Sequence, residues 1–365
     1  MVMANNVLNL YERYKDEFNA KLSEVMHSGN YILGNEVECF EKEWAEFIGT
    51  KYCVGVASGL DALWIGMKML GIGEGDEVIV SANAYIACVM GITINHATPV
   101  FVEPDQYDNI DVNKIEKAIT KKTKAILAVH LYGRSCDMLQ ITSIAKKYNL
   151  LVIEDCAQNH GGEFANQKVG TFGTIGCFSF YPTKTCGAFG DGGCIVTDDF
   201  EIAERIRIFR NYGSEKKYHN CVVGANSRLD EMQAGLLRVK LNHLSEIIQE
   251  RTKIAERYFD RISNPYIQLP KVHSCDNPSW HLFVLHVIQG KRDDLIKHLD
   301  SKKITSMIHY PIPPYLAEAY TNLNLRKGSF PLAERYADEV LSIPFYNGLT
   351  EEEQDAVIEA INTFK

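Results

Sequence analysis

The sequence lacks the marks of several protein classes. No apolar run approaches the ~20 residues that a membrane-spanning helix needs, and the first residues, MVMANNVLNLYERYKDEF, contain no basic region followed by an apolar stretch. We therefore expect no secretory signal, no membrane attachment and a cytoplasmic protein. Lysine and arginine are dispersed within a net charge of -9, which argues against a nucleic-acid partner. A small-molecule partner is the expectation that remains.

Paired cysteines are also absent. The ten cysteines lie singly along the chain, several inside apolar runs such as residues 86–89, and none forms a CxxC pair. In a chain without a secretory signal this pattern predicts reduced, buried cysteines that behave as small hydrophobic residues. We predict neither disulfides nor a metal site.

The chain does contain a regular alternation of short and long apolar patterns. At 365 residues it is too long for one simple core, so we expect a large domain and a smaller one. Longer amphipathic stretches, such as residues 111–119 and 141–148, alternate with short β-branched runs at residues 52–57, 77–80, 99–102, 125–129, 150–154 and 194–197. This alternation predicts an α/β fold with a mostly parallel sheet covered by helices on both faces.

The pattern changes near residue 226. A long helical segment follows, with Ser227 placed to cap it, and then come a strand-like run at 281–288, a helix at 292–303 and a final helix with Thr350 and Glu353 in a capping box. We predict a large α/β domain at residues 1–245, which includes an N-terminal helical segment, and a small α+β domain at 246–365.

One lysine precedes a glycine-rich loop in SFYPTKTCGAFGDGG, residues 179–193. Nucleotide-binding motifs place the glycines before the lysine or between a strand and a helix, whereas here Lys184 comes first and a strand follows. The order excludes a P-loop and a dinucleotide fingerprint. By itself the stretch is equally consistent with a surface turn that carries an exposed lysine.

Two other clusters follow predicted strands. Asp155 ends a buried strand pattern, where it could serve a ligand or cap the next helix. Ser58 and Gly59 lie between a strand and a helix, where free backbone N–H groups favour an anion. A lysine, an acid and a phosphate site are together what a pyridoxal phosphate enzyme needs: the lysine forms a Schiff base, and the acid holds the pyridine nitrogen protonated.

With these parts in place, the chain resembles the fold-type I, pyridoxal phosphate-dependent nucleotide-sugar aminotransferases of the DegT/DnrJ/StrS type. The resemblance extends over nearly the whole chain and is carried by segments such as VASGLDAL, VHLYGR, VIEDCAQNHGGEF, GTFGTIGCFSFYPTKTCGAFGDGG, NYGSEKKYHN, NSRLDEMQAGLLRVKL and IHYPIPP. It implies a large domain with a mostly parallel seven-stranded sheet and a small C-terminal α+β domain.

The resemblance also implies the site residues. Lys184 and Asp155 would be catalytic, as the Schiff-base lysine and the partner of the pyridine nitrogen. The other cofactor-binding residues would be Gly59, Leu60, Tyr85, Gln158, Ser179 and Asn226, with Asn226 reaching the phosphate in a neighbouring subunit. Substrate contacts would come from Lys216, Lys217, Tyr218, His309 and Tyr310, although a Lys-Lys pair is also typical of a solvated loop.

The substrate implied is a nucleotide-linked keto-6-deoxyhexose, with dTDP as the nucleotide and L-glutamate as the donor that leaves as 2-oxoglutarate. The cofactor would alternate between pyridoxal and pyridoxamine phosphate in a homodimer with shared active sites, serving the synthesis of an amino-deoxysugar for O-antigen or another surface glycan. Leu60 replaces the threonine common in relatives, and with YGSEKKYHN and IHYPIPP it favours amination at C-3 over C-4. A dehydratase of this family carries histidine where this chain has Lys184, and a regulatory protein without catalysis would not need Lys184, Asp155 and Gln158 together.

Overall fold

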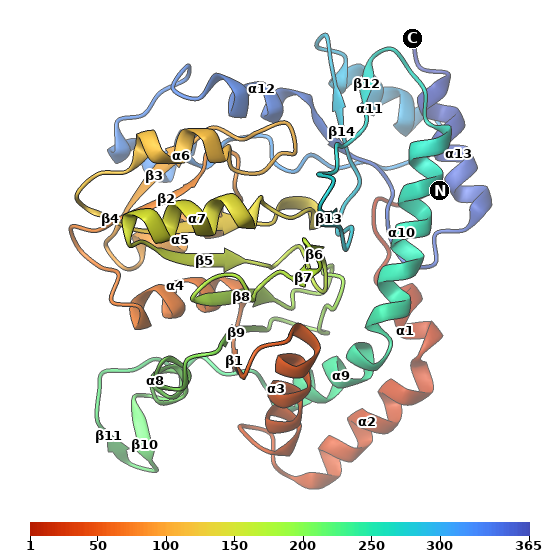
Figure 1. Ribbon diagram of the computed structural model, residues 1–365. Helices are drawn as coiled ribbons and strands as arrows, with labels where there is room; N and C mark the ends of the chain where they lie inside the picture. The colour runs from red at the N-terminus through yellow and green to blue at the C-terminus, as the bar shows by residue number, and fades with distance from the viewer.

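The computed structural model describes residues 1–365 and is built around a seven-stranded sheet (Figure 1). Its order is β1-β9-β8-β5-β4-β2-β3, and β9 alone runs antiparallel to its neighbours. The strands are β1 (Tyr52–Val56), β2 (Glu77–Ser81), β3 (Thr98–Val102), β4 (Thr123–Val129), β5 (Leu151–Asp155), β8 (Ile175–Ser179) and β9 (Gly193–Thr197). The predicted mostly parallel sheet is confirmed, and β8 is the one strand that the sequence reading did not assign.

Both faces of this sheet are buried because its strands alternate apolar side chains between them. Val78 and Val80 of β2 join the core beneath one set of helices, whereas Ile79 joins the core on the opposite face. The first face is covered by α4 (Gly59–Met69), α5 (Ile86–Thr93) and α8 (Phe200–Arg210). The second is covered by α6 (Val112–Ala118) and α7 (Met138–Tyr148), with α3 (Asn35–Ile48) and α9 (Glu231–Asn242) near β1 and β9.

The long helix predicted from residue 227 is two helices. It is α9 followed by α10 (Leu244–Arg261), with His243 between them in a non-helical conformation. Ser227 does not cap either helix: its hydroxyl accepts a hydrogen bond from Ala57 N (3.1 Å) and donates one to Asp61 (2.6 Å). The prediction that Ser227 caps the helix is wrong, because α9 begins only after Asp230 and the Ser227 hydroxyl links this segment to the start of α4.

A second apolar core lies beyond α10, between that helix and a three-stranded sheet. Its elements are β12 (Ile267–Gln268), β14 (Val284–Val287), β15 (Val340–Ser342), α11 (Arg292–Ser301) and α13 (Glu351–Asn362). The capping box predicted at the start of α13 is present, with Thr350 and Glu353 bonded to each other's backbone N–H groups. The N-terminus joins this core too, since Val2 is buried in it and pairs with Ile304.

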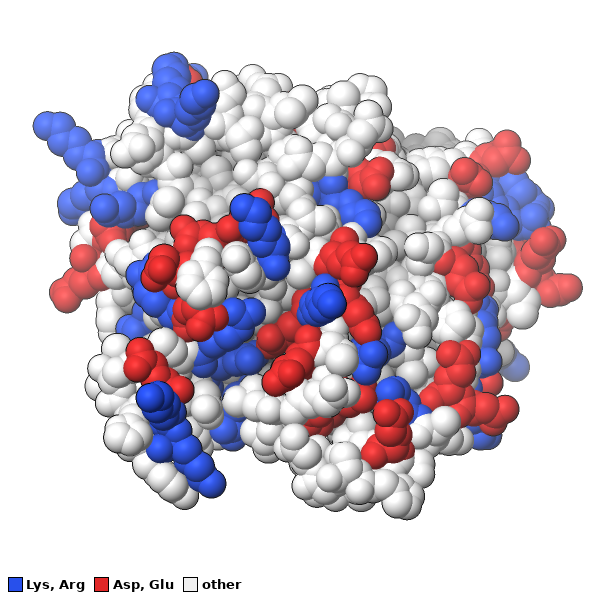
Figure 2. Space-filling view, turned by 60° about the horizontal axis from the view of Figure 1, so that its bottom comes forward, with Lys and Arg blue, Asp and Glu red and all other residues white.

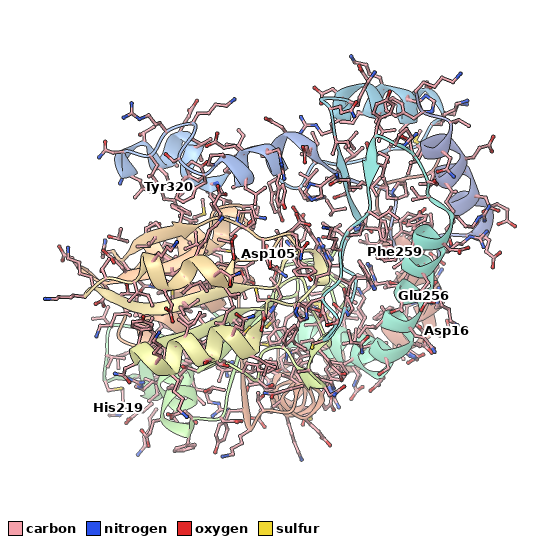
Figure 3. All side chains as sticks on the ribbon, turned by 45° about the horizontal axis from the view of Figure 1, so that its top comes forward. Asp16, Asp105, His219, Glu256, Phe259 and Tyr320 are labelled. Atoms are coloured by element: carbon pink, nitrogen blue, oxygen red, sulfur yellow. The ribbon has the colours of Figure 1, made fainter.

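The C-terminal half also returns to the large sheet. Its η2 (Pro314–Leu316), η3 (Glu318–Leu323) and α12 (Pro331–Glu339) pack on the sheet's β3 side, where Tyr320 bonds to Thr93 (3.1 Å) and Tyr336 bonds to Asp105 O (3.0 Å). Figure 3 shows Tyr320 and Asp105 on that side, whereas Phe259 and Glu256 mark α10 at the other. The domain division at residue 245 therefore stays a proposal. The N-terminus packs in the C-terminal core, and segments of the C-terminal half pack on the large sheet.

The remaining elements are short or peripheral. The helices α1 (Leu8–Arg13) and α2 (Lys15–Ser28) lie along α9 and α10 at the bottom right of Figure 1. A small sheet joins β6 (Glu163–Phe164), β7 (Gln167–Lys168) and β13 (Asp276–Asn277), and η1 (Leu131–Gly133) follows β4. The hairpin of β10 (Ser214–Lys216) and β11 (His219–Asn220) projects at the lower left, and His219 marks it in Figure 3.

All ten cysteines are free thiols, and seven of them are buried, as the sequence predicted for most. No helix of the structure combines the length and the apolar character that crossing a membrane requires. Acidic and basic side chains are interspersed over the face shown in Figure 2 rather than gathered by sign.

Candidate active site

A cavity of about 530 Å³ opens at the carboxyl ends of the parallel strands. Parallel strands end at the same edge, so the segments that follow β1, β2, β4, β5 and β8 converge there. The cavity is lined by nine of the predicted site residues: Gly59, Leu60, Tyr85, Asp155, Gln158, Ser179, Lys184, His309 and Tyr310. Residues from both sides of position 245 thus meet in one site.

Asp155 is the buried acid of the cavity, whereas Asp191 is exposed, and two hydrogen bonds hold Asp155. Its Oδ1 accepts from Ala157 N (3.1 Å), and its Oδ2 accepts from the Cys88 thiol (3.0 Å). The carboxyl group is 6% exposed, so both bonds lie in a poorly hydrated environment and its orientation is fixed. Burial first, and then the charge of Asp155, raise the pKa of Cys88 well above its usual value, which keeps the thiol protonated as the donor.

The start of α4 forms a close backbone approach beside Ser179. Ser58 caps the helix, its hydroxyl accepting from Asp61 N (3.1 Å), which leaves the first amides of α4 near the cavity. A Cβ atom on Gly59 would lie 2.4 Å from Cβ of Ser179, so no larger residue fits without movement. A helix start with a serine beside it suits a phosphate group. Leu60 lines the same place and offers only its main chain.

Lys184 follows β8 on the turn that leads to the glycine-rich loop. Its backbone N–H donates to Tyr181 O (2.8 Å), and the loop is held from behind by Lys240, whose Nζ donates to Gly187 O (2.5 Å). Burial lowers the pKa of Lys184 to about 8, although Asp155 and Cys88 act in the opposite direction. The ambiguity left by the sequence is resolved, because this lysine faces a cavity and is not on an exposed turn.

Gln158 and two tyrosines form one wall of the cavity. The Gln158 amide accepts from Tyr132 N (2.7 Å) and donates to the Tyr310 hydroxyl (3.0 Å). The Tyr310 ring lies 4.8 Å from that of Tyr85, tilted by 33°. Tyr85 is 44% exposed, so its ring is a large apolar face on an open side of the cavity. A flat aromatic ligand would find a stacking surface there.

His309 approaches the same wall from the C-terminal half. Its Nδ1 pairs with the Ser342 hydroxyl at 2.8 Å, and its carbonyl accepts from the Tyr132 hydroxyl. Burial, followed by the charge of Lys184, lowers the pKa of His309 to about 4. His309 is therefore uncharged near neutral pH.

The structure does not bring four predicted residues to this cavity. Lys216, Lys217 and Tyr218 lie on the exposed β10–β11 hairpin, where Tyr218 is 86% exposed. Asn226 is exposed and donates to the Tyr212 hydroxyl (2.9 Å). None of them lines the cavity of its own chain, and their contribution to a site stays a prediction that needs a second subunit.

Cys88 and His281 are among the cavity residues that the sequence reading missed. Cys88 lies three residues after Tyr85 at the start of α5, and this helical spacing could have indicated that both face the same side. His281 precedes β14 in SWHLF, far along the chain from every other lining segment except the one with His309 and Tyr310. No local pattern distinguishes it from a core histidine.

One cluster of potential metal ligands adjoins the cavity: His130, which also lines it, with Glu154 and Cys156. The Glu154 carboxylate already accepts from His130 Nε2 (3.1 Å) and from three backbone N–H groups, those of Gly170, Phe172 and Gly173, at 2.7 to 2.8 Å. His130 Nδ1 accepts from Cys136 N (3.1 Å). These bonds occupy the ligand atoms of His130 and Glu154, which thereby tie β4 and β5 to the following loops.

Residues 12–362 match the model of the DegT/DnrJ/EryC1/StrS aminotransferase family. The chain belongs to this family. It is 50% identical over 353 residues, 96% of both chains, to the dTDP-3-amino-3,6-dideoxy-alpha-D-galactopyranose transaminase of Aneurinibacillus thermoaerophilus. It is 43% identical over 96% of its length, and 93% of the relative's, to the dTDP-3-amino-3,4,6-trideoxy-alpha-D-glucose transaminase of Streptomyces venezuelae.

Solved structures of this aminotransferase family share the fold. S. venezuelae DesV in complex with a ketimine intermediate has a TM-score of 0.96 at 42% identity and covers 99% of this chain and 97% of its own. NtdA from Bacillus subtilis with bound cofactor PMP has a TM-score of 0.90 at 32% identity, covering 96% of this chain and 81% of its own. The predicted aminotransferase fold and family are confirmed.

Proposed function

We propose that the protein transfers an amino group to a dTDP-linked 3-keto-6-deoxyhexose with pyridoxal phosphate as its cofactor. The observation that carries the proposal is the cavity in which Lys184, with a pKa lowered to about 8, faces the buried carboxyl group of Asp155. A lysine with a lowered pKa is suited to covalent and acid-base chemistry near neutral pH. Membership of an aminotransferase family narrows that chemistry to amino transfer.

The cavity residues fit this cofactor. The close approach of Gly59 to Ser179 leaves a helix start for the phosphate, Tyr85 offers a ring face, and Asp155 offers an oriented acid. Lys184 would hold the cofactor covalently, Asp155 would pair with its pyridine nitrogen, and Gln158 would lie toward its hydroxyl group. When bound, pyridoxal phosphate supplies an electron sink for the carbon that loses or gains the amino group.

Residues of the chain would then transfer and hold protons. With a pKa near 8, about a tenth of the Lys184 amines are uncharged at pH 7, so the amine can both take up and return a proton at the reacting carbon. His309 and His281 stay neutral, and Lys184 is the only lysine or arginine that lines the cavity. Asp155, pinned by Cys88 and Ala157, can favour a protonated pyridine ring without moving.

The substrate class is proposed from the relatives. The A. thermoaerophilus relative, at 50% identity, and the S. venezuelae relative, at 43%, are named as transaminases of dTDP-linked 3-amino sugars. We therefore favour a keto group at C-3 and dTDP as the nucleotide, and we keep C-4 amination of a dTDP-4-keto-6-deoxyglucose as the alternative. L-glutamate is the proposed donor, and a cytoplasmic role in making an amino-deoxysugar for O-antigen or another surface glycan is the proposed setting.

We also propose that the active form is a homodimer. The exposed hairpin with Lys216, Lys217 and Tyr218, and the exposed Asn226, provide cations and an amide that the cavity of the same chain does not use. In a dimer they could reach the diphosphate of a substrate and the cofactor phosphate in the neighbouring subunit. The proposal predicts that a monomeric variant binds the nucleotide sugar poorly.

The test is turnover with separate sugars. Purified enzyme loaded with pyridoxal phosphate is incubated with L-glutamate and either the dTDP-linked 3-keto or the 4-keto-6-deoxyhexose, while 2-oxoglutarate and the product mass are followed. We expect an amino sugar from the 3-keto substrate and none from Lys184→Ala. An amino sugar from the 4-keto substrate alone would favour the alternative, and none from either would contradict the proposed function.

A further inference from the structure

We propose that His281 binds a hydroxyl group of the keto sugar, an assignment that rests on the proposed transamination. His281 lines the same cavity as Lys184 but comes from the C-terminal half of the chain, as do His309 and Tyr310. The side chains of His309 and Tyr310 bond to Ser342 and Gln158, whereas Nδ1 of His281 has no partner.

The imidazole of His281 is an incompletely satisfied polar group. The residue is 5% exposed, and its Nδ1 has no hydrogen-bond partner in the protein. A buried polar atom left unpaired costs roughly 1–3 kcal/mol, so folded proteins rarely retain one without a use. His160 also has an unpaired ring nitrogen, but of these two histidines only His281 lines the cavity.

Residues from both halves of the chain hold the backbone that carries this imidazole. His281 N donates to Tyr132 O (3.1 Å), and Arg251 donates to His281 O (3.1 Å). A Cβ atom on Gly133 would lie 2.4 Å from His281 N, which shows how closely the turn after β4 packs against it. The backbone of His281 is therefore held beside the cavity, which limits where its ring can lie, and such pre-positioning favours binding.

The chemistry of the ring favours a sugar hydroxyl over the carboxylates of an amino acid. Burial, followed by the charges of Lys184 and Arg251, lowers the pKa of His281 well below its usual value, so the ring is uncharged. A neutral imidazole carries one N–H donor and one acceptor, and a hydroxyl can serve either of them. A carboxylate offers acceptors only, and a cation compensates its desolvation better than a neutral ring does.

Three variants of the loaded enzyme test the assignment: His281→Phe, His281→Asn and His281→Gln. Phenylalanine keeps a flat ring and removes both nitrogens, asparagine places an amide near Nδ1, and glutamine places one near Nε2. Each half-reaction is run as a single turnover that starts from the amino compound, either a dTDP-linked 3-amino-3,6-dideoxyhexose or L-glutamate. The absorbance of the bound cofactor is followed. Binding of dTDP alone is measured by calorimetry as the control for the nucleotide site.

We expect His281→Phe to raise the half-saturating concentration of the amino sugar about tenfold, the effect of one lost hydrogen bond. The values for L-glutamate and dTDP should stay within about twofold, and one amide variant should recover most of the loss. Unchanged amino-sugar binding in His281→Phe, an equal loss with L-glutamate, or a loss that neither amide reduces would overturn the assignment alone. A wild-type enzyme that reacts with L-glutamate but with no amino sugar would instead overturn the proposed substrate.

Discussion

The thiol of Cys88 donates a hydrogen bond to Oδ2 of Asp155 at 3.0 Å, on the floor of the cavity that Lys184 faces. Cys88 is 1% exposed and belongs to α5, the helix that Tyr85 precedes. One helix start therefore places both the proposed stacking ring and the group that orients the acid. Cys88 acts through Asp155, so it is a positioning residue.

Replacement of Cys88 tests that relationship. Cys88→Ala removes the donor, and because a thiol is a weak donor we expect a loss of about 1 kcal/mol, a roughly fivefold weaker binding of pyridoxal phosphate. Cys88→Ser keeps a donor of similar size and should bind the cofactor as the wild type does. Fluorescence titration of the cofactor-free proteins measures both. Equal weakening by alanine and serine would contradict the role of the hydrogen bond.

Gly59 offers a steric test of the proposed phosphate site. In Gly59→Ala the new methyl group meets Ser179 at 2.4 Å, so either the start of α4 or Ser179 must shift. We expect at least about tenfold weaker cofactor binding and a loss of stability of about 1–3 kcal/mol from overpacking. Gly73→Ala is the matched control, because its nearest neighbour would be Asn95 O at 3.8 Å. If both variants bind the cofactor like wild type, the phosphate does not lie at this helix start.

Much of this fold follows from the sequence because its strands are buried on both faces. Residues 78–80 and 125–129 are continuous apolar runs, which are typical of the strands of a covered, parallel sheet. The α9–α10 boundary could not be read the same way, since apolar spacing continues through His243 and only the non-helical backbone there reveals the break. Ser227 failed as a cap because its hydroxyl is used by Ala57 and Asp61, 170 and 166 residues away.

The site was predictable to the extent that its residues follow strands. Asp155 and Ser179 end strands and Gly59 begins the helix that follows β1, so all three lie at the carboxyl edge of the sheet. Cys88 and His281 enter through tertiary packing, and their meaning depends on distances to Asp155 and to the cavity that no local spacing encodes. Contacts with a second subunit cannot be derived from local sequence spacing or from the structure of a single chain, because they too depend on distances that neither contains.

A buried charge cluster predicts how stability depends on pH. Burial alone would lower the pKa of His286, but the charge and hydrogen bond of Asp108 (2.8 Å), with Glu339, raise it to about 9. Because the pKa of His286 is higher in the folded than in the unfolded protein, its protonation stabilises the fold. This stabilisation is complete below the unfolded pKa of about 6.5 and is lost as the pH rises through the folded pKa of about 9. The stability lost in His286→Gln should therefore shrink by about 3 kcal/mol between pH 6.5 and 9.

Urea unfolding of both proteins across that range measures the difference, and other titrating groups cancel in it. His298→Gln is the control, because that imidazole bonds to Ala360 O and not to a carboxylate. A difference between wild type and His286→Gln that stays constant from pH 6.5 to 9 would show that Asp108 does not hold His286 charged.

In the cofactor-free protein, Lys184 should make stability rise with pH, which is opposite to the effect of His286. Burial lowers its folded pKa to about 8, below the unfolded value near 10.5, so the charged amine destabilises the fold at low pH. The full shift corresponds to about 3 kcal/mol, and partial exposure of the side chain reduces it to about 2 kcal/mol. Relative to Lys184→Met, wild type should gain that much stability as the pH rises from 8 to 10.5. A constant difference in urea unfolding would mean that the amine is well solvated.

The central claim is that Lys184 carries the cofactor, and the most direct measurement is its chemical trapping. Purified protein is loaded with pyridoxal phosphate, reduced with borohydride and digested, and the modified peptide is located by mass spectrometry. The structure predicts a phosphopyridoxyl group on Lys184, in the peptide around SFYPTKTCGAFGDGG, and none in Lys184→Ala. A stoichiometric label on another lysine, with Lys184 unmodified, would contradict the account.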